Sequence, residues 1–268
     1  TMNTPELPQV HIKPLTLSDP WRWLQAGWND FIRTPMIGLA HGLAVTAFGF
    51  LLLTVGYNEF WLLAGAFTGF LAVAPVVAVG LYAVSQALER GQPATFHLVF
   101  RTWWSWRGKP HHDWRLVCFG LLLCLSGTGW VLTSAAFITL LSPEPINQPM
   151  DFLRYVVLAR DNNVFELWWF LGVVLAAPVF ASSVVTLPLL LDRQVSIMDA
   201  VLVSWKVVVQ NPFPMALWAF LIASISGLGL LALAGSVIIV PVLGHASWHA
   251  YRDAVGAEHL PPRVRSQS

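Results

Sequence analysis

The sequence predicts an all-α polytopic membrane protein with six transmembrane helices, arranged as three units that each combine an amphipathic helix with a helical hairpin. Composition predicts the class, because 56% of the 268 residues are hydrophobic and only 11% are charged. A soluble domain of this length normally carries about twice that charged fraction. The apolar residues also form long runs without Asp, Glu, Lys or Arg. Roughly 20 such residues are enough to cross a bilayer.

The apolar runs predict the membrane helices in order along the chain. Four runs predict one transmembrane helix each, over residues 36–55, 60–87, 116–141 and 167–191. A fifth run, 215–251, is too long for one ordinary helix. Gly227 and Gly229 give the chain a place to turn back within it. This run therefore predicts the fifth and sixth helices as a hairpin.

The basic residues predict the orientation in the membrane. Six helices put both ends of the chain on the same side. Thirteen of the 15 Lys and Arg residues fall on that side, and only Arg154 and Arg160 fall on the other. Cytoplasmic loops carry an excess of Lys and Arg. The distribution predicts that both termini face the cytoplasm.

A tryptophan followed seven residues later by a proline occurs three times, each time just before a hydrophobic segment. The pairs are Trp28 and Pro35, Trp103 and Pro110, and Trp205 and Pro212. Each pair closes a short amphipathic stretch, which is the pattern of a helix lying on the membrane surface. Ser18 is the expected N-cap of the first, and Ser196 with Asp199 forms a capping box for the third.

The helices that return from each hairpin also share a feature, a proline inside an apolar segment, at Pro75, Pro178 and Pro241. A proline there removes one backbone hydrogen bond and kinks the helix. We therefore predict a cytoplasmic segment 1–17, a single membrane domain 18–256 and a cytoplasmic tail 257–268. The three units of the domain span about 18–91, 94–193 and 196–256. A coincidence of spacing is the alternative, since Trp and Pro are both frequent at membrane interfaces.

Histidines distinguish the third unit from the other two. His245 and His249 stand four and eight residues after Pro241, where the other units have small or neutral residues. His41 is the only other histidine within a predicted membrane helix, and it lies between Gly38 and Gly42. Small residues at this spacing let a second helix approach closely. We expect the first and last membrane helices to be neighbours, with the three imidazoles close together.

Two interpretations of these histidines stay open. Three imidazoles are a plausible ligand set for copper or zinc, and two opposed imidazoles can bind haem iron axially. Trp248, Tyr251 and Arg252 would support such a site. The alternative is packing, in which the histidines hydrogen-bond across helices, for example to the carbonyl that Pro241 leaves free. In that case His249 simply lies in the membrane interface.

Other chemistry is scarce in the sequence. No predicted membrane helix has a central charged residue, as proton relays and ion-coupled carriers usually require. The chain has no glycine-rich phosphate loop, no Cys-x-x-Cys motif and no recognisable nucleophile and base. The sequence therefore predicts a protein that is not an enzyme. Its near-zero net charge argues against a nucleic-acid partner.

Three stretches resemble a family of uncharacterised bacterial integral membrane proteins: VGLYAVSQALERGQ after Pro75, LPLLLDRQVSIMDAVLVSWKVVVQNP, and PVLGHASWHAYRD. The likeness extends from about His11 to Gly256. It implies a six-span fold in the bacterial inner membrane. Some family members carry automatic labels that link them to cytochrome c oxidase, whereas this chain lacks the full ligand set for haem and copper in that subunit.

These observations lead to two functional hypotheses. The first is an accessory or assembly protein of the inner membrane, in which His41, His245 and His249 hold or pass haem or copper for a respiratory complex. The second is a facilitative transporter or channel for a small solute, in which the kinked helices line the route. The bilayer is the partner that both hypotheses share.

Overall fold

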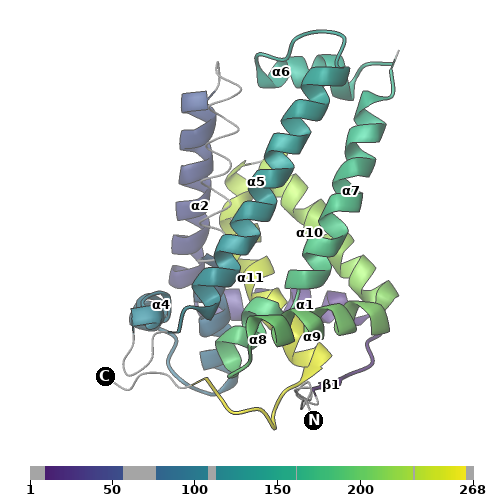
Figure 1. Cartoon of the computed structure of the whole chain (residues 1–268). Helices are drawn as coiled ribbons and strands as arrows, with labels where there is room; N and C mark the ends of the chain where they lie inside the picture. The colour runs from purple at the N-terminus through teal and green to yellow at the C-terminus, as the bar shows by residue number, and fades with distance from the viewer. Residues whose placement is uncertain (1–9, 57–76, 108–112, 161, 232, 264–268) are drawn as a thin grey trace.

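The computed structural model describes residues 10–56, 77–107, 113–160, 162–231 and 233–263. These residues are almost entirely helical (Figure 1). Besides loops, the described residues contain a short antiparallel pair, β1 (His11–Ile12) and β2 (Val255–Gly256), and an isolated bridge between Arg193 and Pro262, which the sequence did not predict. Because β1 pairs with β2, the two described ends of the chain lie at the same end of the molecule.

The helices follow the predicted order. The first part of the chain contains α1 (Asp19–Arg33), α2 (Pro35–Gly56) and the helix Val77–Glu89. The middle of the chain contains α4 (Phe96–Trp103), a 3-10 turn (Ser105–Arg107), α5 (Arg115–Leu141), α6 (Pro149–Phe152), a π-helical turn (Leu153–Val157), α7 (Val164–Ser183) and α8 (Thr186–Asp192). The last part contains α9 (Ile197–Gln210), α10 (Pro212–Leu231), a 3-10 turn (Leu233–Gly235) and α11 (Ser236–Ala254).

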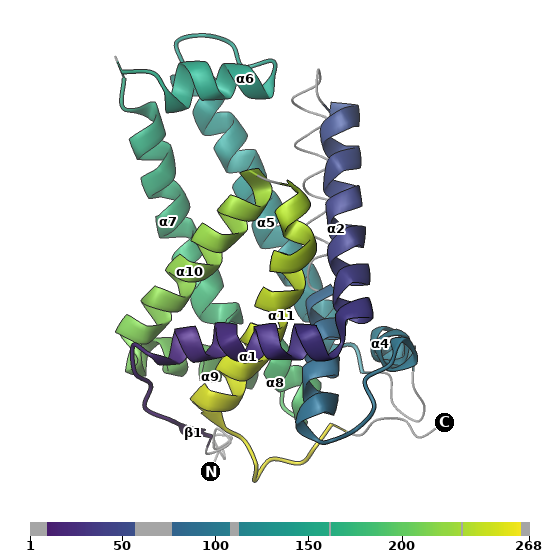
Figure 2. The ribbon, with the colours of Figure 1, turned by 180° about the vertical axis from the view of Figure 1, so that it is seen from behind.

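Four helical segments in the described residues are long and apolar enough to cross a membrane: Pro35–Thr54, Arg115–Leu141, Val164–Asp192 and Pro212–Gly229. The predicted number of six is therefore not confirmed. Of the second predicted span only the shorter apolar helix Val77–Glu89 is described. α11 is not among the four, and the α10–α11 hairpin ends part-way up the height of α5 and α7 (Figures 1 and 2).

α1 and α9 lie across the base of the molecule, and each ends in the same backbone conformation. The C-cap Thr34 has φ −132° and ψ 53°, and the C-cap Asn211 has φ −130° and ψ 55°. The next residue in both cases is a proline that begins a long helix, Pro35 or Pro212. A residue before proline is disfavoured in the α region. The chain therefore turns there from the base into the membrane helix.

The predicted caps had different outcomes. The Ser196 side chain accepts a hydrogen bond from the Asp199 amide at 3.0 Å, as the capping box predicts. Ser18 makes no such bond, so its predicted role was wrong. The Asp19 carboxylate accepts from the amide of Thr16, which precedes the helix, at 2.6 Å.

Each of α1, α4 and α9 packs against a helix of a different predicted unit. α4 lies against the helix Val77–Glu89, where Val99 packs on Val84. α9 lies against α7 and α8, and α1 lies against α11 (Figure 2). The division into three repeated units stays a prediction. The order of these contacts is cyclic, because the first surface helix packs on the last returning helix.

α2 and α11 are neighbours, as expected for the first and last predicted membrane helices. Gly42 of α2 lies directly on the backbone carbonyl of Val237 in α11, so that a Cβ at Gly42 would overlap with that carbonyl. His41 is buried beside this contact. The small-residue face around His41 therefore brings two helices together, as predicted.

We expect Gly42→Ala to destabilise the protein by about 1–3 kcal/mol, the usual cost of overpacking. Adding one methyl group forces α2 away from α11, because the group it meets is backbone rather than a movable side chain. The matched control is Gly129→Ala in α5, where a Cβ meets nothing within 4 Å. Thermal unfolding in detergent measures both. Equal midpoints for the two variants would contradict the close contact.

Candidate functional site

The polar side chains at the end of α11 bind partners in other parts of the chain. Three elements supply these partners: α1, the helix Val77–Glu89, and α8. The pairs are His245 with Ser85 (2.7 Å), Trp248 with Glu89 (2.9 Å), His249 with Asp30 (2.8 Å), Tyr251 with Asp192 (2.8 Å), Arg252 with Glu89 (2.8 Å) and Trp23 with Asp253 (2.8 Å). The C-terminal end of α11 is thus the junction at which these three elements meet at the base of the molecule.

Asp192 accepts hydrogen bonds from four side chains at this junction. Its carboxylate is 3% exposed and follows the buried leucines of α8. It accepts from Gln86 Nε2 at 2.7 Å, Arg90 Nη2 at 2.8 Å, Tyr251 Oη at 2.8 Å and Arg193 Nε at 3.0 Å. A buried carboxylate is costly unless it is paired and hydrogen-bonded. Here its donors come from all three predicted units.

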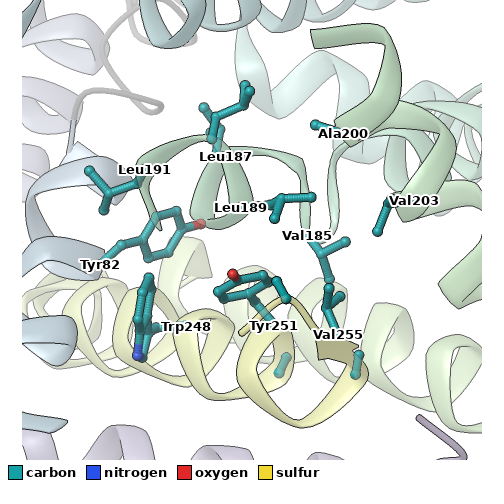
Figure 3. Close-up of a cluster of buried hydrophobic side chains, with 14 of the residues drawn as sticks. Tyr82, Val185, Leu187, Leu189, Leu191, Ala200, Val203, Trp248, Tyr251 and Val255 are labelled. Atoms are coloured by element: carbon teal, nitrogen blue, oxygen red, sulfur yellow. The ribbon is translucent and has the colours of Figure 1, made fainter. Parts of the chain in front are cut away.

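A layer of apolar side chains covers this polar junction. Trp248 and Tyr251 of α11 face Leu189 and Leu191 of α8, with Tyr82 beside them (Figure 3). All five side chains are buried. Because Tyr251 and Asp192 are both buried, the hydrogen bond between them is electrostatically stronger than it would be at the surface.

The segment after β2 fastens the second unit to the third. Arg263 Nε donates to Asp113 at 2.8 Å, and its Nη2 donates to Ser105 at 2.8 Å. The Arg263 amide also donates to the Asp192 carbonyl at 3.0 Å. Burial would raise the pKa of Asp113, but hydrogen bonds from Arg115 and the charge of Arg263 outweigh it and hold the pKa well below its usual range.

Asp30 links α1 to this junction from a buried position. Its carboxylate is 5% exposed and pairs with His249 Nε2 at 2.8 Å. Burial alone would raise the pKa of Asp30. The hydrogen bond from His249, with the other effects of His249, Ser85 and His245, outweighs burial, and the pKa of Asp30 is lowered from 3.8. The shift favours the ionised carboxylate, which pairs with His249.

Hydrogen bonding fixes which ring nitrogen of His41 carries the proton. His41 Nδ1 lies 2.7 Å from the Ile37 carbonyl, which can only accept, so Nδ1 donates and Nε2 is left as a lone-pair acceptor. His245 Nδ1 lies 2.7 Å from Ser85 Oγ, and either of these two atoms can be the donor. The Nε2 atoms of His41 and His245 are both buried and have no hydrogen-bond partner in the described structure.

The surroundings of these rings do not fit a porphyrin. α2 and α11 are in backbone contact at Gly42, and Gly244 of α11 lies on Leu81. His41 Nε2 lies 2.9 Å from the position of a Cβ on Gly80. These contacts leave no room for a macrocycle between the three helices. Among the described residues, no group of three or more His, Cys, Asp or Glu is arranged to hold a metal ion.

The remaining predicted site residues are placed as follows. Pro178 lies inside α7 and Pro241 inside α11, whereas Pro75 lies outside the described residues. Trp248 and Tyr251 are buried, and Arg252 bridges Glu89 and Asp192. Each of these three side chains contacts a residue of another element.

The sequence did not single out the acceptors of this junction. Asp30, Ser85, Glu89 and Asp192 come from three separate segments of the chain. One signal was available, because a carboxylate that directly follows a run of leucines, as Asp192 does, needs a buried partner. The identity of that partner depends on which helices meet, and periodicity does not encode it.

The all-helical fold with several apolar spans defines an integral membrane protein. Residues 62–192 match the model of a family described as "Predicted integral membrane protein (DUF2189)". The resemblance to a family of predicted integral membrane proteins is thus confirmed, over a shorter part of the chain than the sequence suggested. No curated protein and no solved structure matches the chain.

The pairing of Asp30 with His249 predicts a specific acid sensitivity. Because the pKa of Asp30 is lower in the folded protein than its ordinary value of 3.8, the pair contributes stability above about pH 3.8. That contribution is lost as the pH falls through the lower, folded-state pKa. We expect Asp30→Asn to remove this part of the acid dependence and His249→Gln to shift it to higher pH.

Unfolding midpoints measured in detergent across the acidic range check this prediction. Asp113→Asn is a useful comparison, because it removes a different carboxyl group whose pKa is lowered and leaves the contact between α1 and α11 intact. If Asp30→Asn and the wild-type chain lost stability in parallel on acidification, the predicted role of Asp30 would be wrong.

Proposed function

We propose that this chain is a non-enzymatic accessory or assembly protein of a membrane complex, in the bacterial inner membrane with both termini in the cytoplasm. The observation that carries the proposal is the contrast in packing between the base of the molecule and its membrane helices. At the base, the polar side chains of α11 are paired, and His245, Trp248 and Tyr251 are buried. In the four membrane-spanning segments, only 11–28% of the most apolar window is buried within the chain.

The exposed spans offer large apolar surfaces for contact with other membrane helices. On α5, Leu125 is 67% exposed and Leu132 58%, and on α7 Phe170 is 65% exposed. Helices associate in a bilayer chiefly through such side-chain packing and through interhelical hydrogen bonds. A rigid base that carries weakly packed spans suits a protein that binds a partner better than one that encloses a solute route within its own helices.

The contacts of the histidines support a packing role within this proposal. His249 is engaged by Asp30 and His245 by Ser85. For copper binding, only two buried ring nitrogens of the three histidines are without a hydrogen-bond partner in the described structure, the Nε2 atoms of His41 and His245. We therefore assign the histidines to the joints of the base and do not include haem in the proposal.

Site-specific photo-crosslinking in cells tests the proposal. A photoreactive residue replaces Leu132 on α5, Phe170 on α7, or Phe50 on α2, all of which are exposed. We expect the photoreactive residue at one of these three positions to give a discrete adduct with a subunit of a membrane complex. We also expect the amount of assembled complex to fall when the gene for this chain is deleted. The other positions serve as lipid-facing controls.

The proposal would be contradicted if every position gave adducts with lipid alone and liposomes containing the purified chain showed solute flux. That combination would favour a transporter. An absorption spectrum of the same preparation tests the role of the histidines. A Soret band that is lost in His245→Leu would overturn the packing role.

A further inference from the structure

α1 exposes large apolar side chains and buries two acidic ones, and its buried face also contains Trp23 and Phe31. The face that packs on α11 contains Asp19 and Asp30, both buried. The outer face exposes Trp21 (56%), Trp28 (46%) and Ile32 (53%). In a soluble protein the apolar stripe of a surface helix faces the core. An exposed apolar stripe of this kind indicates that it is covered by something other than water.

The same stripe recurs on α9, at the same distances from the proline that begins the next helix. The positions fourteen, seven and three residues before the proline hold Trp21, Trp28 and Ile32 in α1, and Met198, Trp205 and Val209 in α9. The α9 side chains are 67%, 40% and 68% exposed. In α4 the first two positions hold Phe96, which is exposed, and Trp103, which is half-buried.

Each complete stripe continues onto a membrane helix. Met36 in the first turn of α2 is 71% exposed, and Phe213 in the first turn of α10 is 77% exposed. The outer surfaces of α1 and α9 are therefore continuous with the surfaces of two spans. Since lipid surrounds the exposed faces of a span, it also covers the stripes that run into them.

The exposed charges near these stripes have one sign. Arg33 of α1, Arg101 of α4 and Lys206 of α9 are exposed. The two acidic residues of α1 are buried, and Asp199 of α9 is half-buried and bonded to Ser196. Basic residues beside an apolar face complement the headgroups of anionic phospholipids.

We propose that α1, α4 and α9 form a lipid-binding collar, which inserts its apolar stripes at the boundary between acyl chains and headgroups of one leaflet and binds anionic phospholipid through Arg33, Arg101 and Lys206. The collar needs the membrane location only, so it is independent of the protein partner proposed above. It fixes the depth of the base, and hence the level at which the spans enter the bilayer.

Depth-dependent fluorescence quenching tests the collar. On the full-length chain with Cys118→Ala and Cys124→Ala, a single cysteine at Trp28, Trp205 or His259 carries an environment-sensitive dye. The protein is reconstituted in phosphatidylcholine vesicles. His259 is an exposed residue of the C-terminal segment, away from the stripes, and is the control. We expect shallow doxyl-labelled lipid to quench the dyes at 28 and 205, and aqueous iodide to quench the dye at 259.

Iodide quenching at 28 and 205 equal to that at 259 would overturn the collar, because the stripes would face water. Strongest quenching by a doxyl group at the end of the acyl chain would also overturn it, since the helices would be too deep. Protection from both quenchers would show that protein covers the stripes.

Native mass spectrometry of the detergent-purified chain with added phosphatidylglycerol tests the choice of lipid. The variant carries Arg33→Gln, Arg101→Gln and Lys206→Gln. At about 1 kcal/mol for each basic residue near an anionic surface, each loss weakens binding by about fivefold. The control carries Arg154→Gln and Arg160→Gln in the loop between α5 and α7. Unchanged lipid binding in the first variant, or an equal loss in the control, would overturn the role of these charges.

Discussion

The carboxylate of Asp192 is the interaction on which the rest of the structure depends. It is buried beneath aromatic and leucine side chains, and it accepts hydrogen bonds from the helix Val77–Glu89, from its own segment and from α11. The backbone of the same residue receives the Arg263 amide from the C-terminal segment. Removing one partner from such a buried set costs about 3–5 kcal/mol, because the others are left without compensation. Four separated stretches of sequence are held at this one residue.

The cyclic order of the helix contacts explains why α11 is so polar. Three helix contacts make up this order. Those of α4 with the helix Val77–Glu89 and of α9 with α8 are made largely by small, apolar and hydroxyl side chains, such as Val99 on Val84 and Thr186 on the Ala200 carbonyl. At the third joint α1 presents Asp30, a buried charge that needs donors. His249 pairs with this carboxylate directly, and His245 is hydrogen-bonded to Ser85. We infer that the histidines close a ring of helices.

The sequence was sufficient for the helical class, the order of the elements, the α9 cap and the contact between the first and last predicted membrane helices. Each of these depends on local periodicity, or on small residues such as Gly42 whose effect is local. The role of the histidines was left open, because it depends on Asp30 and Ser85, which lie more than 150 residues away in sequence. The outward-facing stripe of α1 was also only partly predicted, because the sequence indicated an amphipathic stretch that ends with Trp28 and Pro35 but did not indicate which of its faces is exposed.

A mutant cycle around Asp192 tests the central claim most directly. Gln86→Leu, Tyr251→Phe and the double variant are compared by their free energies of unfolding in detergent, first in the native background and then with Asp192→Leu. If Gln86 and Tyr251 are joined through the Asp192 carboxylate, they are coupled by at least about 0.5 kcal/mol in the native background, and the coupling disappears without Asp192. Additive effects in the native background would contradict the claim that this carboxylate holds the base together.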